Sequence, residues 1–302
     1  MATQNNINGS SILTQFTASG TWTKNPRTTA ITIFGISSGS GAGSGRQGST
    51  TSAGGAAGGN SSSFIWCERM PASVFGTSET VTIGGTSSGG ATQSTNGNDG
   101  NTSAAQNSTM IGSIGAIAQT GVSPGGTSTS SAAVARTGIN FIYMGASNPV
   151  LGFNVAGGAG SNTNGSVGQT NTGNAAGASY YMGTAGGGGS GANSATAQQA
   201  GNGGAIIFWS TTITAAGAGG IETGTINGGN GTSVTLPNHG LLSAGTGGGG
   251  GGGQKSGGSA GTGGNGGTPG GSGGGGGGSI TGTNSGAGGT GQAGELWVIE
   301  FF

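Results

Sequence analysis

Acidic, basic and nucleophilic side chains are scarce in this chain, and their spacing does not assemble a catalytic centre. The 302 residues contain one histidine, His239, and a single aspartate, Asp99. General acid–base chemistry needs two titratable groups that reach the same substrate. Glu295 and Glu300 are the closest acidic pair, but an odd sequence separation directs them to opposite sides of a strand. The other glutamates are scattered, at positions 68, 79 and 222. We therefore predict that the chain is not an enzyme.

Two stretches that resemble functional motifs do not change this prediction. His239 lies in a turn-like Pro-Asn-His-Gly sequence, which is a poor setting for the base of a serine triad. Lys255-Ser256 follows Gly253-Gln254 without the leading pattern of a phosphate-binding loop. Histidine, cysteine and carboxylate residues do not cluster at metal-ligand spacing. We expect no catalytic residue, no cofactor and no metal.

The single cysteine, Cys67, ends the apolar run Phe64-Ile65-Trp66-Cys67. One cysteine cannot form an intramolecular disulfide, so no covalent link staples the glycine-rich segments. In an apolar run, cysteine is usually a small buried residue. We expect Cys67 to be buried rather than reactive.

Non-covalent binding is the more plausible chemistry. Tyr180-Tyr181-Met182 lies between glycine-rich stretches, and aromatic residues at loop tips supply contact area at a small entropic cost. The stretch from Ser161 to Asn174 is rich in asparagine, threonine and serine, which could bind a polar glycan. Two alternatives stay open: the tyrosines could form a short buried strand, and the polar stretch could be a solvated loop. The predicted receptor-binding residues are Tyr180, Tyr181, Asn162, Asn164 and Asn174.

Composition restricts the possible partners. Glycine supplies 80 residues, charged side chains make up 4 %, and the formal net charge is zero. Nucleic-acid binding requires a positively charged stripe, and a neutral chain with only six basic residues argues against it. A disordered chain usually stays in solution through a high net charge, which this chain lacks. No apolar run approaches the roughly 20 residues needed to cross a bilayer, and no secretory signal pattern is found. We expect no nucleic-acid partner, no membrane insertion and no export by the usual routes.

Short runs of β-branched and aromatic residues, bounded by turn-forming residues, predict strands. In Thr80–Ile83, Val81 and Ile83 alternate with threonines, as a half-buried strand requires. The last run is almost continuously apolar, which favours an interior strand. Isoleucines at 111, 114 and 117 have a helix-like spacing, but glycines interrupt them and we predict loop or strand. The predicted strands are 30–34, 64–67, 80–83, 139–143, 205–209 and 296–302.

The glycine-rich tract at 245–294 allows two outcomes. Glycine and serine form flexible linkers, because glycine loses the most conformational entropy on ordering. The alternative is a bundle of polyglycine II helices, with three residues per turn and lateral hydrogen bonds. That packing needs many segments or chains in register, since an unsatisfied buried amide costs about 1–3 kcal/mol. We favour ordered packing bracketed by the strands or by a neighbouring subunit. Glycine without a sustained period and only six prolines exclude collagen.

Several landmarks follow one another in a specific order. They are the stretch Phe16–Pro26 with its Gly-Thr-Trp turn, the stretch Met70–Gly76, the strand Thr80–Gly84, and the closing Gly291–Phe302. This order resembles the glycine-rich domains of phage tail-fibre and tail-tip adhesin proteins. The likeness covers roughly residues 12–115 and 290–302, and the middle is similar only in composition. Serine, threonine and alanine dilute the first tract, 36–59, where family members often have an unbroken glycine block, and this weakens any inference of polyglycine packing there.

The resemblance implies a virion component at or near the host-facing end of a phage tail, usually a homotrimer. It implies no particular receptor. Together with the strand pattern, it leads us to expect an all-β fold: a sandwich or jelly-roll-like core with long glycine-rich loops, which could include polyglycine II segments, in a trimer. Residues 1–11 would be an N-terminal attachment segment. Residues 12–302 would be one glycine-rich β domain, closed by the C-terminal strand.

The expected function is that of a phage tail-fibre or tail-tip protein that binds a host receptor without covalent chemistry. Its partners would be itself as a homotrimer, other tail or virion proteins, and a host cell-surface receptor or glycan. It would be made in the host cytoplasm and located in the virion tail. One alternative is a purely structural fibre-to-tail adaptor or capsid appendage. A more distant alternative is an ice-binding protein.

Overall fold

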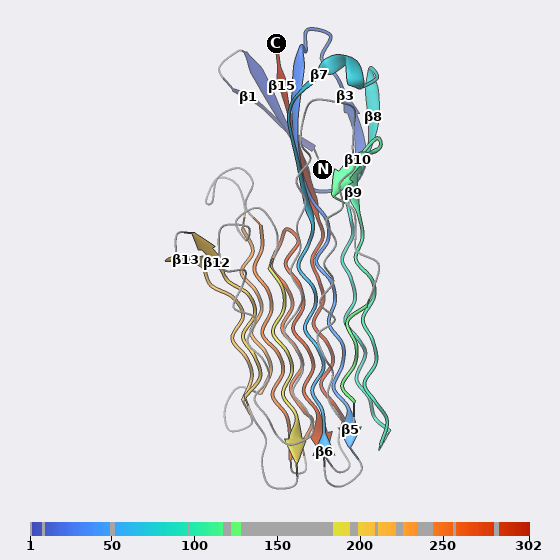
Figure 1. Cartoon of the computed structure of the whole chain (residues 1–302), viewed down its shortest axis with the longest axis vertical. Helices are drawn as coiled ribbons and strands as arrows, with labels where there is room; N and C mark the ends of the chain where they lie inside the picture. Colours follow the sequence, from blue (N-terminus) through green and yellow to red (C-terminus); the bar gives the residue numbers. More distant parts are fainter. Residues whose placement is uncertain are drawn as a thin grey trace.

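The computed structural model shows an all-β protein in which a β-sheet head continues into a long bundle of extended glycine-rich segments (Figure 1). No α-helix occurs in the described part of the chain, which contains one 3-10 turn at Ala72–Val74. The structure describes residues 2–7, 10–48, 52–95, 97–116, 122–127, 184–193, 199–208, 211–221, 226–234, 244–255, 258–280 and 284–302.

Two antiparallel sheets form the head. The larger has the order β1-β2-β15-β4-β7, and the smaller has the order β10-β9-β8-β3. Their strands are β1 (Ala2–Ile7), β2 (Ser11–Phe16), β3 (Gly20–Thr23), β4 (Ala30–Ile36), β7 (Phe64–Pro71), β8 (Ser78–Thr82), β9 (Thr109–Ile111), β10 (Ile114–Ala116) and β15 (Glu295–Phe301).

The main apolar core lies between these two sheets. Ile33, Leu296 and Val298 of the larger sheet belong to one buried cluster with Trp22 and Val81 of the smaller sheet. The Trp22 ring meets Phe75 edge-on, with centroids 5.7 Å apart. Burying each large aliphatic or aromatic side chain contributes roughly 1.5–3 kcal/mol. The head is therefore stabilised by side-chain packing, as in other β-sandwiches.

The last strand, β15, occupies the middle of the larger sheet, between β2 and β4. On its second face, Trp297 packs against Phe34 at a centroid distance of 5.1 Å, and both belong to a second buried cluster that includes Leu13 and Phe64. Both faces of β15 are thus covered. This confirms the prediction that the closing apolar run is an interior strand.

The predicted strands at 30–34, 64–67, 80–83 and 296–302 are confirmed as β4, β7, β8 and β15. The run at 205–209 is confirmed in part, as β12 (Ile206–Phe208), which pairs with β13 (Thr211–Thr214). The stretch with isoleucines 111 and 114 forms the β9–β10 pair. The predicted strand at 139–143 lies outside the described residues.

Sequence reasoning did not predict β2 or β3. Ile12, Leu13 and Phe16 of β2 are interrupted by Thr14 and Gln15, so neither strict alternation nor a continuous apolar run is visible. In β3, only Trp22 is buried, and the strand begins with a glycine. Both strands are fixed by their long-range partners, β15 and β8, rather than by their own composition.

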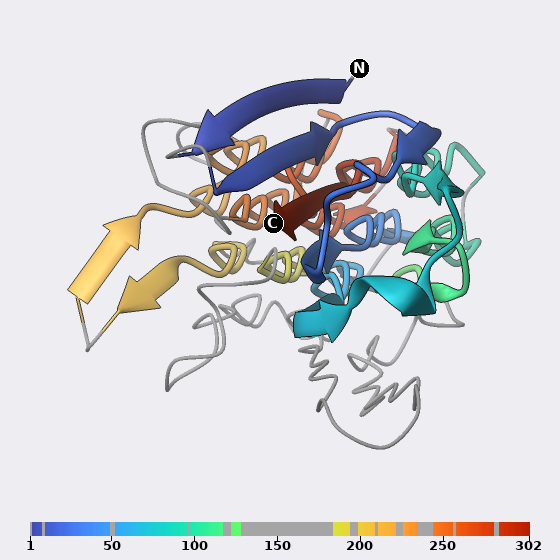
Figure 2. The ribbon, with the colours of Figure 1, turned by 90° about the horizontal axis from the view of Figure 1, so that it is seen from above.

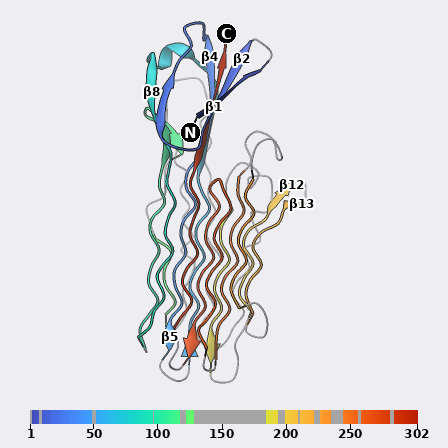
Figure 3. The same ribbon diagram turned by 180° about the vertical axis from the view of Figure 1, so that it is seen from behind.

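Below the head, the chain runs up and down as extended segments that lie side by side (Figures 1 and 3). Several of them continue directly from head strands: segment 37–46 follows β4, and segment 284–294 leads into β15. Viewed along the long axis, each segment appears as a tight coil packed among its neighbours (Figure 2). We call these segments the bundle: 37–46, 54–63, 84–93, 98–108, 122–127, 184–191, 199–205, 215–221, 226–234, 244–254, 258–268, 270–279 and 284–294.

Hydrogen bonding in the bundle repeats every three residues. The backbone amides of Ser38, Gly39 and Ser40 donate to the carbonyls of Asn107, Gln292 and Asn60, which belong to three different segments. The next turns repeat the pattern: Ala42 donates to Gly289, Gly43 to Ala57, and Ser44 to Asn101. Three residues per turn without internal hydrogen bonds define a polyproline II-type helix, here composed largely of glycine. The segments of one chain therefore supply the lateral partners that ordered packing requires.

Glycine is needed in the interior because the segments approach so closely. A Cβ atom added at Gly274 would lie well under 3.0 Å from the carbonyl oxygen of Gly249, and one added at Gly264 would meet the carbonyl oxygen of Gly229 in the same way. Neither oxygen can move without losing its place in the bundle. The side chain is absent there because the neighbouring main chain occupies its space.

The described parts of the first tract, 37–46 and 54–59, pack in the same way as the later segments, although the serine, threonine and alanine in this tract weakened that inference from sequence. Ser38 and Ser44 are fully buried, and their hydroxyl oxygens accept the backbone amides of Asn107 and Asn101, each at 2.7 Å. A serine side chain can thus take the place of a carbonyl acceptor in the bundle. A tract that contains serine can therefore pack in this way, because a hydroxyl oxygen accepts a hydrogen bond from a backbone amide as a carbonyl oxygen does.

The bundle ends, away from the head, in short strand pairs. Strand β5 (Gln47–Gly48) pairs in parallel with β14 (Ser279–Ile280), and β6 (Ser52–Ala53) pairs with β11 (Ala192–Asn193). Ala53, Ala192 and Ile280 form a small buried cluster at this end. We call the region around these pairs the far end of the bundle.

Candidate binding surfaces

The receptor-binding residues predicted from sequence, Tyr180, Tyr181, Asn162, Asn164 and Asn174, lie outside the described residues. His239 and Trp209 also lie outside them. The surfaces described below therefore come from other parts of the chain.

Glu295 and Glu300 point to opposite faces of β15, as their spacing predicts. Glu300 is buried, and its Oε1 atom accepts hydrogen bonds from the backbone amide of Asn25 and the hydroxyl of Thr28, both at 2.8 Å. This carboxylate holds the β3–β4 connection against the end of β15. Its partners are thus a main-chain amide and a hydroxyl of that connection.

Glu295 lies on the aromatic face of the larger sheet, where Gln15 donates a hydrogen bond to its carboxylate. Burial raises the pKa of the Glu295 carboxyl to about 7, while the Gln15 hydrogen bond acts in the opposite direction. Glu295 lies where the head joins the bundle, one residue after Gly294. Glu295 is thus a buried carboxyl that changes its charge near neutral pH.

Cys67 is buried in the sandwich core, which confirms the sequence prediction. Burial raises the pKa of its thiol to about 11, so the thiolate is scarce at neutral pH. Among the described residues, no three His, Cys, Asp or Glu side chains come together in a metal-binding group. Nor does that part of the chain include a helix with the length and apolar character to span a membrane.

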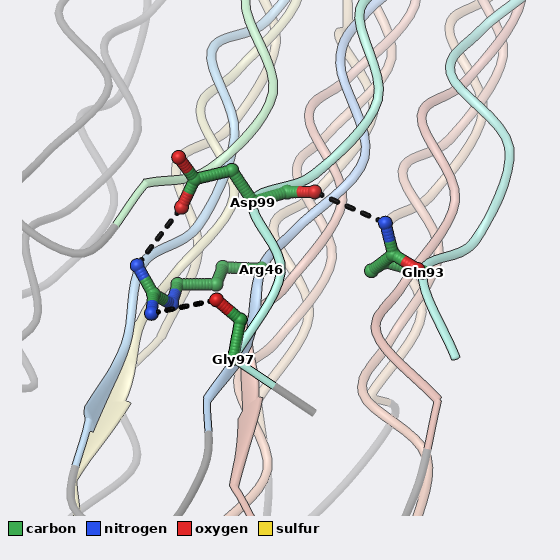
Figure 4. A network of polar contacts seen from close by, with 4 residues as sticks. All are labelled: Arg46, Gln93, Gly97 and Asp99. Atoms are coloured by element: carbon green, nitrogen blue, oxygen red, sulfur yellow. Dashed lines mark hydrogen bonds and ion pairs between the residues drawn. The ribbon is translucent and has the colours of Figure 1, made fainter. Parts of the chain in front are cut away.

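The far end carries a small polar network (Figure 4). Arg46 bonds the carboxylate of Asp99 at 2.8 Å and the carbonyl oxygen of Gly97 at 3.0 Å. The side-chain amide of Gln93 donates to the main-chain carbonyl of Asp99 at 3.2 Å, and its backbone amide donates to the hydroxyl oxygen of Ser285 at 2.9 Å. The Asp99 side chain is 57 % exposed, against 15 % for Arg46. The network thus holds Gly97 and Asp99 against Arg46 and leaves the Asp99 carboxylate facing solvent.

The opposite end, which we call the apex of the head, carries two stacked cations. The guanidinium of Arg27 lies 4.7 Å from the ring centroid of Phe302, and that of Arg69 lies 4.6 Å from the ring centroid of Phe301. Lys24 is held by the carbonyls of Ala72 and Phe75 at 2.7 and 2.8 Å. Stacking on an aromatic face stabilises a cation by about 0.5–1 kcal/mol at an exposed site.

Arg69 has an unusual backbone. Its φ angle is +46°, the one positive value at a non-glycine residue in the described chain, and it lies where the β4–β7 register shifts. Its amide donates to the hydroxyl of Thr32 at 3.0 Å. Such bulges re-aim a side chain, here toward Phe301. Sequence reasoning missed this surface because the Phe301 and Arg69 positions are adjacent only through sheet pairing.

No family model matches the sequence, and no curated protein matches it.

Proposed function

We propose that this chain is a phage tail-fibre or tail-tip protein that recognises a host receptor by non-covalent contact. The sequence landmarks that resemble tail-fibre glycine-rich domains support this proposal. The observation that carries it is structural: the bundle is a long body held by main-chain bonds, and the β5–β14 and β6–β11 strand pairs lie at its far end, remote from the head. A rigid stem that presents loops at one end is the geometry of an adhesin.

The far end is the proposed contact surface. Gly48, Ser52, Asn193, Lys255 and Ile280 all end described segments there, as shown by the β5–β14 and β6–β11 pairs and by the bridge between Gln254 and Ser279. Sequence stretches that join such segments can vary without disturbing the interior bonds. Residues 184–191 and 199–205 are themselves bundle segments that bond to their neighbours through the main chain. Replacing them would disturb the bundle, so only the residues that connect such segments are suitable for replacement in a binding experiment.

The proposal includes assembly as a homotrimer and attachment to other virion proteins through the head. Light scattering of the purified full chain should give three times the 27.9 kDa chain mass. A monomer at all concentrations would overturn the trimer.

Binding of the purified protein to intact host cells tests the adhesive role. We expect replacement of residues 49–51, 194–198 and 281–283 by glycine-serine sequence of the same length to abolish binding. The matched control is the same replacement at 235–243, which joins Val234 to Ala244; Ala244 belongs to the second buried cluster of the head. If every far-end replacement leaves binding unchanged, the chain is better explained as a structural adaptor.

A further inference from the structure

One side of the bundle presents a regular array of amides and hydroxyls. Segments 226–234, 258–268 and 284–294 are parallel neighbours: Gly228 and Gly231 donate to the carbonyls of Thr262 and Asn265, and Gly263 donates to that of Ala287. Every third side chain on these segments faces solvent. We call the following residues the amide face: Asn227, Asn230, Ser233, Thr262, Asn265 and Thr268, all of them exposed.

The side chains of the amide face are held by the neighbouring main chain. The Oδ1 atoms of Asn227 and Asn230 accept the backbone amides of Thr262 and Asn265 at 3.0 and 2.9 Å. Ser233 accepts the amide of Thr268 at 3.0 Å. Asn265 in turn accepts both the amide and the hydroxyl of Thr290 at 2.9 Å. These contacts fix the side chains of Asn227, Asn230, Ser233 and Asn265 before any ligand arrives, which lowers the entropic cost of binding.

The same contacts determine which atoms are left for a ligand. A backbone amide is always a donor, so the oxygen of each asparagine must face it and the amide nitrogen must point elsewhere. Within the described part of the chain, the Nδ2 groups of Asn227, Asn230 and Asn265 make no hydrogen bond. The amide face is therefore a set of oriented donors, repeated every three residues, or about 9.3 Å along a helix of this type.

The absence of charged residues and the neighbouring apolar residues restrict the class of ligand further. No charged residue occurs in 215–221, 226–234, 258–268 or 284–294. Segment 215–221 lies beside 226–234 through the bond from Gly229 to Ala218, and it presents Ala215, Ala218 and Ile221 to solvent. The amide face thus offers uncharged hydrogen-bond donors beside the aliphatic side chains of segment 215–221. A matching ligand has many oxygen acceptors, apolar C–H faces and a repeating chemical unit.

We propose that the amide face binds an uncharged polysaccharide lying along the side of the bundle. Its sugar oxygens accept the asparagine amides and bond the hydroxyls of Thr262 and Thr268, and its C–H faces cover Ala215 and Ala218. This surface is separate from the far end, and the proposal does not depend on the adhesive role of the far-end loops.

The test uses the purified full chain and a panel of immobilised neutral polysaccharides: dextran, mannan, and β-1,3- and β-1,4-linked glucans. We expect at least one to bind, with an affinity unchanged by raising the salt from about 0.1 to 1 M, because no ionic contact is involved. Asn230→Asp with Asn265→Asp keeps each oxygen acceptor and removes the donors, and should weaken binding at least tenfold.

The matched control is Thr102→Asp with Ala105→Asp, which adds the same two charges at exposed positions on segment 98–108 and should bind as the parent does. Circular dichroism of each variant verifies that the bundle is retained. The proposal is overturned if no neutral polysaccharide binds, or if binding survives the double asparagine variant. It is also overturned if that variant instead abolishes shaping of ice crystals or association of the chain with a second copy, since either result assigns the face to another occupant.

Discussion

The head and the bundle satisfy their main-chain hydrogen bonds in different ways. In the head, strands pair in two sheets and large side chains such as Trp22, Phe34 and Trp297 fill the space between and beside them. In the bundle, side chains are removed, and each turn of three residues bonds to three neighbours. The comparison shows that burial of apolar side chains is not the only route to an ordered interior. Where main-chain segments pack directly against one another, an added side-chain atom disturbs the packing.

The largest expected effect comes from adding side-chain atoms to the bundle interior. Gly274→Val places new atoms against the carbonyl of Gly249, so we expect the free energy of unfolding to fall by at least about 5 kcal/mol. Gly85→Ala is the control, because a Cβ there meets nothing within 4 Å. Denaturant titration of both variants measures the difference. Equal stability of the two variants would contradict close main-chain packing.

Removal of side-chain atoms from the head should have the next largest effect. Leu296 is fully buried in the sandwich core, and Leu296→Ala should lower the free energy of unfolding by about 4 kcal/mol. Because β15 continues from bundle segment 284–294, we expect head and bundle to unfold in one transition. Two separate transitions, with only the first shifted, would show that the two regions are independent.

Glu295, at the junction of the two regions, should make stability depend on pH. Its pKa is about 7 in the fold and its ordinary value is 4.5, so the fold prefers the protonated form. Its stabilising contribution is complete below about pH 4.5 and is lost as the pH rises through 7. Glu295→Gln should therefore raise the free energy of unfolding at pH 8 by on the order of 3 kcal/mol, and have little effect at pH 4.

Denaturant titrations of the parent and of Glu295→Gln across this pH range provide the measurement. A parent protein that becomes more stable between pH 4.5 and pH 7, relative to the glutamine variant, would reverse the expected sign.

The smallest effect concerns the serines that replace carbonyl acceptors in the bundle. The hydroxyl of buried Ser190 accepts the backbone amide of Gly253 at 2.6 Å. Ser190→Ala leaves that buried amide without this acceptor, and should cost about 2 kcal/mol. Ser259→Ala, at an exposed position, should be nearly neutral in the same thermal or denaturant measurement. A neutral Ser190→Ala would mean that the hydroxyl is dispensable.

Sequence patterns were sufficient for the elements that carry large side chains. The alternation at Val81 and Ile83 predicted β8, and the closing apolar run predicted the interior position of β15. Both predictions succeeded because residue type directly indicates which side chains are buried. The bundle was harder to predict. Glycine and serine are equally compatible with a linker and with packed helices, and only the long-range partners of Gly39, Ser40 and their neighbours decide between them.

The candidate surfaces were less predictable than the strands. The amide face depends on residues such as Asn230 and Asn265, which lie far apart in sequence and meet through main-chain pairing of two segments. Their three-residue spacing within each segment was a usable signal: Asn227, Asn230 and Ser233 in one, and Thr262, Asn265 and Thr268 in the next. The Arg69–Phe301 stack depends on a bulge and has no such local signal.

Hydrogen–deuterium exchange of the backbone amides tests the central claim most directly, since that claim concerns main-chain hydrogen bonds between glycine segments. Peptides covering 244–254 and 270–279 should exchange as slowly as those covering β4 and β15, despite their lack of side chains. Exchange of these glycine peptides at the rate of an unstructured chain, beside a protected head, would contradict the ordered bundle.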